Sequence, residues 1–309
     1  MLEVLAKILP IIFLIVLGNV LQKFQFFKLS TIEEFKKLIV NVTLPALLFL
    51  TFAETTFESK YMIIFVVIFM ACVFLLFVGI GLKKLFKSKN KYFPTLFTSF
   101  ENGMIGYALF VAVYGTPNLY KIAIIDLGHI LFVFLILVSY IQKQNGKSAT
   151  VKQLLLSFFK SPIVLAVVLG ILVSSTKTVE FMNQFTLSSS FFELIALLGS
   201  LTVPIICIVI GYELKIDLKN LGKPFGVVLL RMSLLFITAY LINTFILSHM
   251  QLDKEYQIAL YTTFLLPPAF AIPIFMDSKD EENKKFILNV ISINIVLAIV
   301  AFLVLIIVL

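Results

Sequence analysis

"SFENGMIGYALFVAVYG", residues 99–115, decides how this chain is interpreted, because it sets Glu101, Asn102 and three glycines among stretches of almost pure Leu, Ile, Val and Phe. The surrounding apolar window is long enough to cross a bilayer. An acid or a glycine-loosened backbone persists in the hydrocarbon only where protein or a water-filled cavity covers it. The stretch therefore predicts an interrupted, protein-covered segment inside a membrane.

The composition is that of a membrane protein, with 61% hydrophobic and 14% charged residues and a mean hydropathy of +1.08. The net charge of +8 comes from short lysine blocks between apolar windows, which indicates membrane orientation rather than nucleic-acid binding. We predict an all-α integral membrane protein with ten transmembrane helices and no soluble domain. The ten apolar windows lie near residues 5–24, 34–53, 61–82, 92–114, 119–141, 154–175, 191–212, 226–248, 256–276 and 286–309.

Lysines are distributed unequally between alternate loops. Of the 25 Lys and Arg residues, nineteen lie in the loops that follow odd-numbered windows and four in the loops that follow even-numbered windows. The positive-inside rule then places the first set in the cytoplasm and both termini outside. Lys7 and Arg231, the remaining two, lie near window ends, where we expect their side chains to reach the interface.

Ten spans with both termini outside divide into two halves of opposite orientation, residues 1–150 and 151–309, as an inverted repeat requires. "NVTLPALLFL" in the second span resembles "GSLTVPIICIV" in the seventh, and Thr43 and Thr202 precede their prolines by the same spacing. The alternative is that these Thr and Pro residues are only kinks whose neighbours satisfy the backbone. The matching position in each half favours the repeat.

The fourth and ninth spans form a second matched pair, because both contain helix breakers. The fourth holds Gly103 and Gly106, and the ninth holds Pro267, Pro268 and Pro273. Interrupted segments at corresponding places in two halves are the best sequence-level indication of a transporter's binding site. The N-terminus of each resumed half-helix would offer N–H groups and partial positive charge to an anion.

Several motifs in order now give a family resemblance: "LPALLF" after an Asn and a Thr, the glycine-rich fourth span that ends in "VYG", "IIDLGH" in the fifth span and the proline-rich ninth span. Nearly the whole chain resembles the auxin efflux carrier family, which belongs with the bile-acid and arsenite type transporters. The resemblance implies two inverted five-helix repeats with broken fourth and ninth helices that cross. It also implies a scaffold of helices 1, 2, 6 and 7, a transport unit of helices 3–5 and 8–10, a homodimer, and small organic anions as substrates.

The resemblance places Gly103 and Gly106 at the family's crossover glycines, and Pro268 and Pro273 at the prolines of the partner break. Two positions differ from the family pattern. Glu101 stands where the family usually has Asn, and its charge would repel an anion unless the acid is protonated or paired; Ala108 stands where a Pro usually follows the second glycine. We expect the substrate site to include Asn102, Gly103, Gly106, Tyr107, Pro267, Pro268, Pro273, Thr43 and Thr202.

Three ionisable residues are candidates for proton coupling. Glu101 lies about nine residues into its span, roughly 14 Å deep, and is either a protonation switch or a neutral structural acid. Asp126 and His129 are three residues apart and therefore share a helix face. They either relay protons and form a state-dependent ion pair, or make a static bond that ties helices together. Asn294 in the last span is expected to bond between helices.

These features fit a secondary transporter of the plasma membrane whose substrate is a small organic anion such as a carboxylate. We expect it to work by alternating access, with proton coupling. Its partners would be the bilayer, the substrate and a second copy of the chain, with no nucleic acid, metal or cofactor. The chain has no HExxH, Gly-x-Ser-x-Gly or P-loop motif, which argues against an enzyme. A channel would not explain paired breaks. The remaining alternative is a membrane receptor that binds the same ligand class without transporting it.

Overall fold

The structure is a computed structural model that describes residues 2–147, 150–176, 186–213, 222–277 and 279–308. The side chains of residues 2–5, 7, 8 and 186–189 also lie outside the described part, so Lys7 and the loop lysines Lys177, Lys215 and Lys219 are outside it. Every regular element in the described ranges is helical and none is a strand. This confirms the all-α prediction.

Seven helical segments are long and apolar enough to cross a membrane, and an eighth is possible if one bent pair counts as a single span. All seven coincide with expected windows. They are Leu29–Ala53, Tyr61–Leu85, Phe93–Tyr114, Thr116–Gln144, Ser190–Glu213, Gly222–His249 and Glu281–Val308.

Helix α4 (Tyr61–Leu85) illustrates why these helices suit a bilayer. Ile64, Ile68 and Cys72 form one fully buried face, while Phe74 and Phe77 on other faces are 61% and 67% exposed. A helix that is apolar on all sides cannot face water stably, but it can face lipid and protein at once. The exposed apolar side chains therefore mark a lipid-facing surface.

Three expected spans differ from single long helices. Helix α1 (Leu2–Lys23) has a described apolar part of only Leu9–Lys23, and the sixth span is two helices, α8 (Val151–Phe159) and α9 (Pro162–Ser175), bent by 60°. Pro162 at the start of α9 lacks the N–H that would continue the preceding helix. The ninth span is broken.

The chain divides into two compact units. Unit 1 comprises Met1–Tyr61, Gly103–Ala123 and Phe159–Leu214, and unit 2 comprises Met62–Asn102, Ile124–Phe158 and Lys215–Leu309. The elements of unit 1 are α1, α2 (Leu29–Leu38), the π-helix η1 (Ile39–Thr43), α3 (Leu44–Ala53), α5 (Tyr107–Tyr114), η4 (Thr116–Asn118), α9, α11 (Thr186–Ser200) and α12 (Thr202–Glu213).

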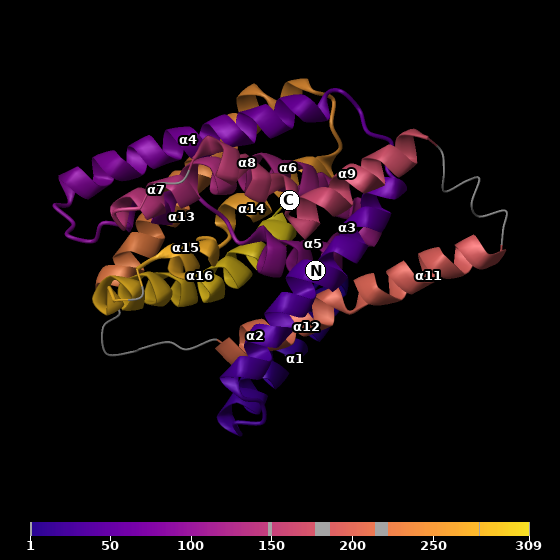
Figure 1. The fold of residues 1–309 in the computed structure, drawn as a ribbon, viewed down its shortest axis with the longest axis horizontal. Helices are drawn as coiled ribbons and strands as arrows, with labels where there is room; N and C mark the ends of the chain where they lie inside the picture. Colours follow the sequence, from indigo (N-terminus) through magenta and orange to yellow (C-terminus); the bar gives the residue numbers. More distant parts are fainter. Residues whose placement is uncertain (1, 148–149, 177–185, 214–221, 278, 309) are drawn as a thin grey trace. The chain divides into compact units, whose positions relative to one another are not determined.

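In unit 1, α1 packs along α12, and α9 packs along α3 (Figure 1). Glycines make both approaches close. A Cβ on Gly18 would lie 2.2 Å from the Ile208 carbonyl oxygen, and one on Gly170 would lie 2.7 Å from the Phe49 carbonyl oxygen. Both helix pairs therefore touch backbone to backbone.

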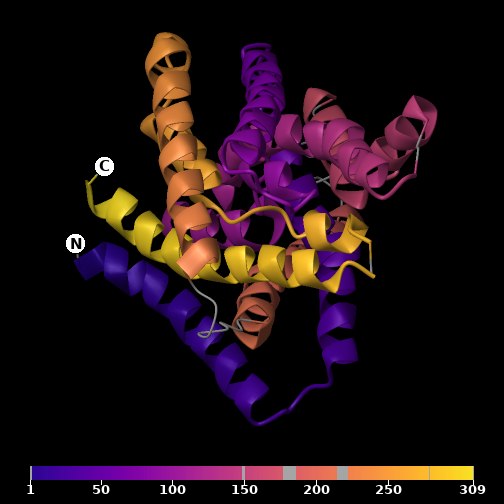
Figure 2. The same ribbon diagram turned by 90° about the vertical axis from the view of Figure 1, so that its left-hand side faces the viewer.

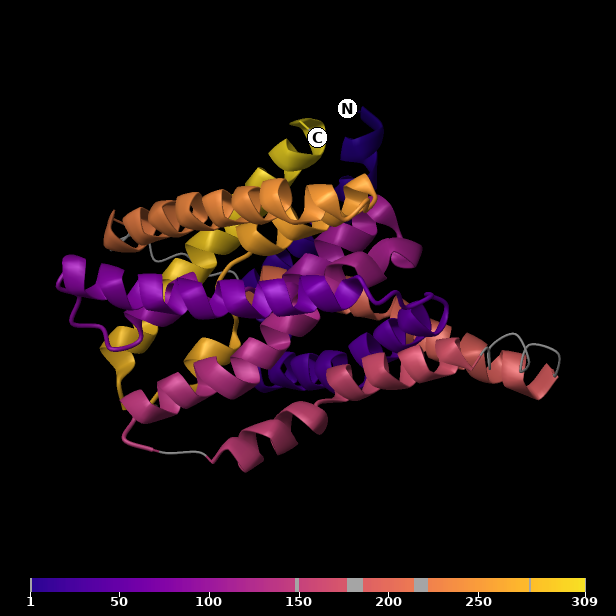
Figure 3. The same cartoon turned by 90° about the horizontal axis from the view of Figure 1, so that it is seen from above.

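Unit 2 contains α4, the 3-10 helix η2 (Phe93–Phe97), η5 (Val133–Leu137), α7 (Val138–Gln144), α8, α13 (Gly222–Phe245), η7 (Leu247–His249), α14 (Lys254–Leu265), α15 (Ala271–Phe275) and α16 (Glu281–Val308). Helix α16 crosses α13 (Figure 2), and α14 returns beside α13 (Figure 3). The π-helix η3 (Asn102–Gly106) and α6 (Leu119–Phe132) continue from one unit into the other. Most of α6, including Asp126 and His129, belongs to unit 2.

The expectation that Arg231 reaches the membrane interface is wrong. Its side chain is 0% exposed and donates hydrogen bonds only to groups within unit 2. A buried cation surrounded by oxygen acceptors does not need water. Arg231 is therefore part of the interior and belongs to the description of the site.

Candidate functional site

The fourth span is interrupted, but not where the glycines alone would place the break. After η2 ends at Phe97, residues Thr98–Glu101 are not helical, and Gly103 and Gly106 lie within the π-helix η3. The physical reason is that polar groups of other segments form hydrogen bonds with backbone groups at residues 96–101. The glycines therefore follow the break instead of forming it.

His129 is one of the groups that stabilise this break. Its Nε2 accepts the backbone N–H of Phe100 at 3.1 Å, and its Nδ1 lies 2.8 Å from Oδ1 of Asp126. Because Nε2 accepts, the proton of the neutral imidazole must be on Nδ1, where it is donated to the carboxylate. His129 and Asp126 are buried, at 4% and 3% exposure. The pair thus bonds to the broken backbone of the fourth span, an arrangement that both the static and the state-dependent alternatives allow.

Asn102 joins three spans at the same place. Its Nδ2 donates to Asp126 Oδ1 at 2.9 Å, and its Oδ1 accepts from the hydroxyl of Thr263 on α14 at 3.2 Å. Both Asn102 and Thr263 are almost completely buried. The carboxylate of Asp126 therefore fixes the position of Asn102, and Asn102 fixes the ninth span.

The ninth span breaks where the prolines predict. Helix α14 ends at Leu265, the chain from Leu266 to Phe270 includes Pro267 and Pro268, and α15 begins at Ala271 with Pro273 inside it. Proline lacks the N–H that a helix needs, so a run of two ends α14. This part of the expectation is confirmed.

The two breaks bind each other within unit 2. The N–H of Glu101 donates to the Pro267 carbonyl at 3.0 Å, and the N–H of Ala269 donates to Ser99 Oγ at 3.3 Å. The N–H of Phe270 donates to Oε2 of Glu101 at 2.6 Å. Backbone groups released by one interruption are thus satisfied by the other, as burial in a membrane requires.

Glu101 lies at the break of the fourth span and contacts the break of the ninth. Its half-buried carboxylate receives the Phe270 N–H at the start of α15, so the acid is paired with a backbone dipole. This hydrogen bond offsets part of the free-energy cost of burying a charged carboxylate within a membrane span. The Glu101 side chain thus links the two breaks.

Sequence reasoning missed three contributors: Thr263, Ser99 and Arg231. The first two carried no signal, since a hydroxyl in an apolar span is usually a local backbone partner. Arg231 did carry one, because a cation within a transmembrane segment is a functional candidate by default. Asn294 accepts a hydrogen bond from Arg231 Nε at 3.0 Å, which confirms its expected role between helices.

The other predicted site residues lie in unit 1. Gly103, Gly106 and the buried Tyr107 follow the break, and Thr43 and Thr202 are completely buried in the second and seventh spans. The hydroxyls of both threonines have no hydrogen-bond partner among the described residues. These five residues thus belong to unit 1, whereas the Asn102–Asp126–His129 cluster belongs to unit 2.

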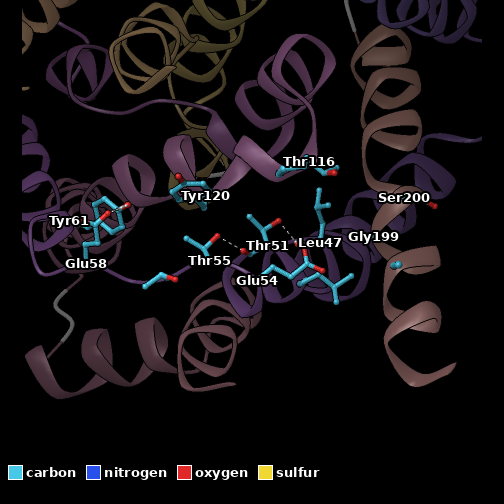
Figure 4. A pocket seen from close by; sticks show the side chains of 14 residues that line it. Leu47, Thr51, Glu54, Thr55, Glu58, Tyr61, Thr116, Tyr120, Gly199 and Ser200 are labelled. Atoms are coloured by element: carbon cyan, nitrogen blue, oxygen red, sulfur yellow. Dashed lines mark hydrogen bonds between the residues drawn. The ribbon is translucent and has the colours of Figure 1, made fainter. Parts of the chain in front are cut away.

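Unit 1 contains a cavity of about 650 Å³ (Figure 4). It is lined by Leu47, Leu50, Thr51, Glu54, Thr55, Thr56, Glu58, Tyr61, Thr116, Pro117, Tyr120, Ala196, Gly199 and Ser200. Glu58 accepts from the Tyr61 hydroxyl at 3.0 Å and pairs with Lys60 at 2.9 Å. Its lining combines hydroxyls with two carboxylates, which disfavours an anion there, and it includes none of the predicted site residues.

A second cavity, of about 460 Å³, lies in unit 2 between η5, α7, α8 and Phe275. Lys147 is the charged residue in its lining. Within the part of the chain that the structure describes, no three His, Cys, Asp or Glu side chains are grouped as a metal site would require.

Comparison with known proteins agrees with this geometry. The profile of the membrane transport protein family matches residues 3–306. The uncharacterized transporter MJ1031 of Methanocaldococcus jannaschii is 25% identical over 232 residues, which cover 72% of this chain and 72% of that protein. The apolar helices and the matched family make this a multi-pass membrane protein of a transporter family, not of an enzyme family. Because the match extends over nearly its whole length, the chain belongs to the membrane transport protein family, that of the auxin efflux carriers.

Proposed function

We propose that the protein is a secondary transporter that moves a small organic anion, such as a carboxylate, across the plasma membrane by alternating access. The observation that carries the proposal is the pair of interrupted spans, whose non-helical segments form the Glu101–Pro267 and Phe270–Glu101 hydrogen bonds within unit 2. Interrupted helices that meet inside the membrane are the usual site of substrate and coupling-ion binding in such carriers. The anionic substrate class rests on the resemblance to the auxin efflux carriers.

The proposed architecture is ten helices in two inverted repeats, residues 1–150 and 151–309. Two packing relations in unit 1 support it: α1, the first span, packs on α12 of the seventh, and α9 of the sixth packs on α3 of the second. In the proposed repeat the first span corresponds to the sixth and the second to the seventh. Replacing each span by its counterpart therefore turns the pair of first and seventh spans into the pair of sixth and second spans. An inverted repeat would produce this relation directly.

The division of the chain supports a stationary and a moving part. Unit 1 holds the first, second and seventh spans and α9 of the sixth, which we assign to a scaffold, and unit 2 holds the third and the eighth to tenth spans. The fourth and fifth spans contribute to both units. Alternating access would then be a movement of unit 2, which holds the non-helical segments of both broken spans, against unit 1. The extracellular termini and a homodimer are part of the same proposal.

Glu101 is the proposed coupling group. Protonation would neutralise a carboxylate beside the expected anion position and weaken its contact with the Phe270 N–H. Asp126 and His129 would keep the fourth span in register while Glu101 changes its charge, because both are engaged in hydrogen bonds to the break. In this proposal Glu101 changes its charge, and Asp126 and His129 hold the fourth span in place.

The test is uptake by the purified protein in liposomes. Candidate carboxylates are first selected by the rise in thermal stability that a native-state ligand produces. Glu101→Gln should still bind substrate and exchange it across the membrane, but net uptake should no longer respond to an imposed proton gradient. Glu54→Gln, a removal of charge in the unit 1 cavity, is the control and should keep the response.

Two results would decide against the proposal. If Glu101→Gln keeps full gradient-dependent uptake, the acid is structural and the coupling assignment fails. If a ligand stabilises the wild-type protein but no carboxylate crosses the membrane, the protein is a receptor of the same ligand class.

A further inference from the structure

Arg231 is a completely buried cation whose partners are all neutral oxygens. From α13, its Nη2 donates to the Ser99 carbonyl at 2.7 Å and to the Leu266 carbonyl at 2.8 Å. Nη1 donates to the Leu96 carbonyl, and Nε donates to Asn294 Oδ1. The guanidinium carbon lies 5.8 Å from the centre of the Phe100 ring. From its own helix, Arg231 thus contacts both breaks and one further span, α16.

The acceptors have a common origin. Leu96 and Ser99 end the first half of the fourth span, and Leu266 caps the end of α14, the first half of the ninth. Interrupting a helix leaves its last carbonyls without N–H partners and concentrates partial negative charge there. Carbonyls of this kind at the ends of interrupted helices are the groups with which many transporters coordinate a sodium ion.

We infer that Arg231 is the built-in cation of the two breaks, in the place that a bound metal cation would otherwise occupy, and that transport therefore needs no sodium ion there. The inference rests on the proposed function for its transport consequence only. Arg231 is a positioning residue: it holds the ends of two half-helices together and need not touch substrate. The planar guanidinium is suited to this role because its donors diverge toward several acceptors at once.

The decisive experiment tests whether a free cation can replace the Arg231 side chain, and whether a neutral molecule of similar shape cannot. Arg231→Ala removes the charge and leaves space of roughly the size of guanidinium. Unfolding is followed by the reactivity of Cys72, which is 0% exposed on α4 of unit 2, in a Cys207→Ala background. The probes are low millimolar guanidinium chloride and urea, a neutral molecule of similar planar shape.

We expect Arg231→Ala to unfold at a lower temperature than the parent, and guanidinium to restore several degrees in a saturable manner. Urea at the same concentration should restore nothing, and neither probe should stabilise the parent. Lys223→Ala, which removes an exposed charge from the same helix, is the control and should behave like the parent. Equal responses to guanidinium and urea, or no response in a folded Arg231→Ala protein, would overturn the inference.

If Arg231→Ala does not fold, Arg231→Lys and Arg231→Met replace it. Lysine keeps the charge with fewer donors and methionine keeps most of the volume, so the lysine variant should be the more stable one. Equal or reversed stabilities would contradict a cationic role.

Transport supplies a separate measurement. Wild-type uptake should change less than twofold when sodium is replaced by choline, and a strict sodium requirement would overturn the inference. The unfolding measurements need no substrate. A protein that passes them but transports nothing would refute the proposed function and leave the role of Arg231 intact.

Discussion

Replacement of Gly211 by alanine tests the close packing of α1 on α12. A Cβ at this position would lie 1.9 Å from the Ile15 carbonyl oxygen and 3.0 Å from the Asn19 nitrogen. These are backbone atoms, which cannot rotate away as a side chain can. To reach an ordinary contact of 3.4 Å, the two helices must separate locally by about 1.5 Å.

The expected cost follows from two opposing effects. Overpacking a tight contact costs roughly 1–3 kcal/mol, whereas Gly→Ala inside a helix recovers about 0.5–1 kcal/mol. We expect a net loss of about 1–2 kcal/mol in the free energy of unfolding. At roughly 2–4 °C per kcal/mol, the unfolding midpoint should fall by about 2–8 °C.

The assay uses the chain's own thiols, because the sequence contains no tryptophan. Cys207 lies on α12, one turn before Gly211, and is 0% exposed. In a Cys72→Ala background, a thiol-reactive fluorogenic dye then reports unfolding of unit 1 alone. Gly226→Ala on α13 is the control, since an added Cβ there meets nothing within 4 Å. A Gly211→Ala midpoint equal to that of the Gly226→Ala variant would refute the packing argument.

Three further predictions concern the network, acid stability and topology. Asp126→Asn removes the charge that accepts two buried hydrogen bonds, so the Cys72 midpoint should fall by the equivalent of about 1–3 kcal/mol; an unchanged midpoint would contradict the network. Hydrogen bonding by Asn283 lowers the pKa of Asp280, so its contribution to stability should be present at neutral pH and lost as the pH falls through that lowered pKa. Asp280→Asn should therefore lose less stability between about pH 7 and about pH 3 than the parent, as measured by thermal unfolding at each pH. In intact cells, a cysteine at Lys254 should react with an impermeant thiol reagent and one at Lys87 should not; the reverse would refute the proposed orientation.

Features that depend on composition along the chain could be predicted well. Seven of the expected spans are apolar helices, because the length of an apolar run directly measures its ability to cross a bilayer. The ninth break also followed from the sequence, since Pro267 and Pro268 remove N–H groups whatever surrounds them. These are local properties of the chain.

The fourth break depended on partners that are distant in sequence. Gly103 and Gly106 indicated a loosened helix, but the non-helical backbone lies before them, where His129 accepts the Phe100 N–H and Arg231 donates to the Ser99 carbonyl. A sequence identifies the residues that weaken a helix more readily than those that stabilise its interruption. The same reason explains why Arg231 was expected at the interface: its position near a span end was visible, and its four acceptors were not.

The charges at the two breaks suggest why a proton and an anion would be taken up together. His129 is neutral in its hydrogen-bonding arrangement, which leaves Arg231 with the carboxylates of Asp126 and Glu101, a net charge of −1 when both acids are ionised. A further anion would be repelled by that set. Oδ1 of Asp126 accepts from two buried donors, whereas Oε2 of Glu101 accepts the Phe270 N–H. Protonation of Glu101 brings the set to neutrality, so under the proposed function an anionic substrate should bind best in the state that already carries the proton.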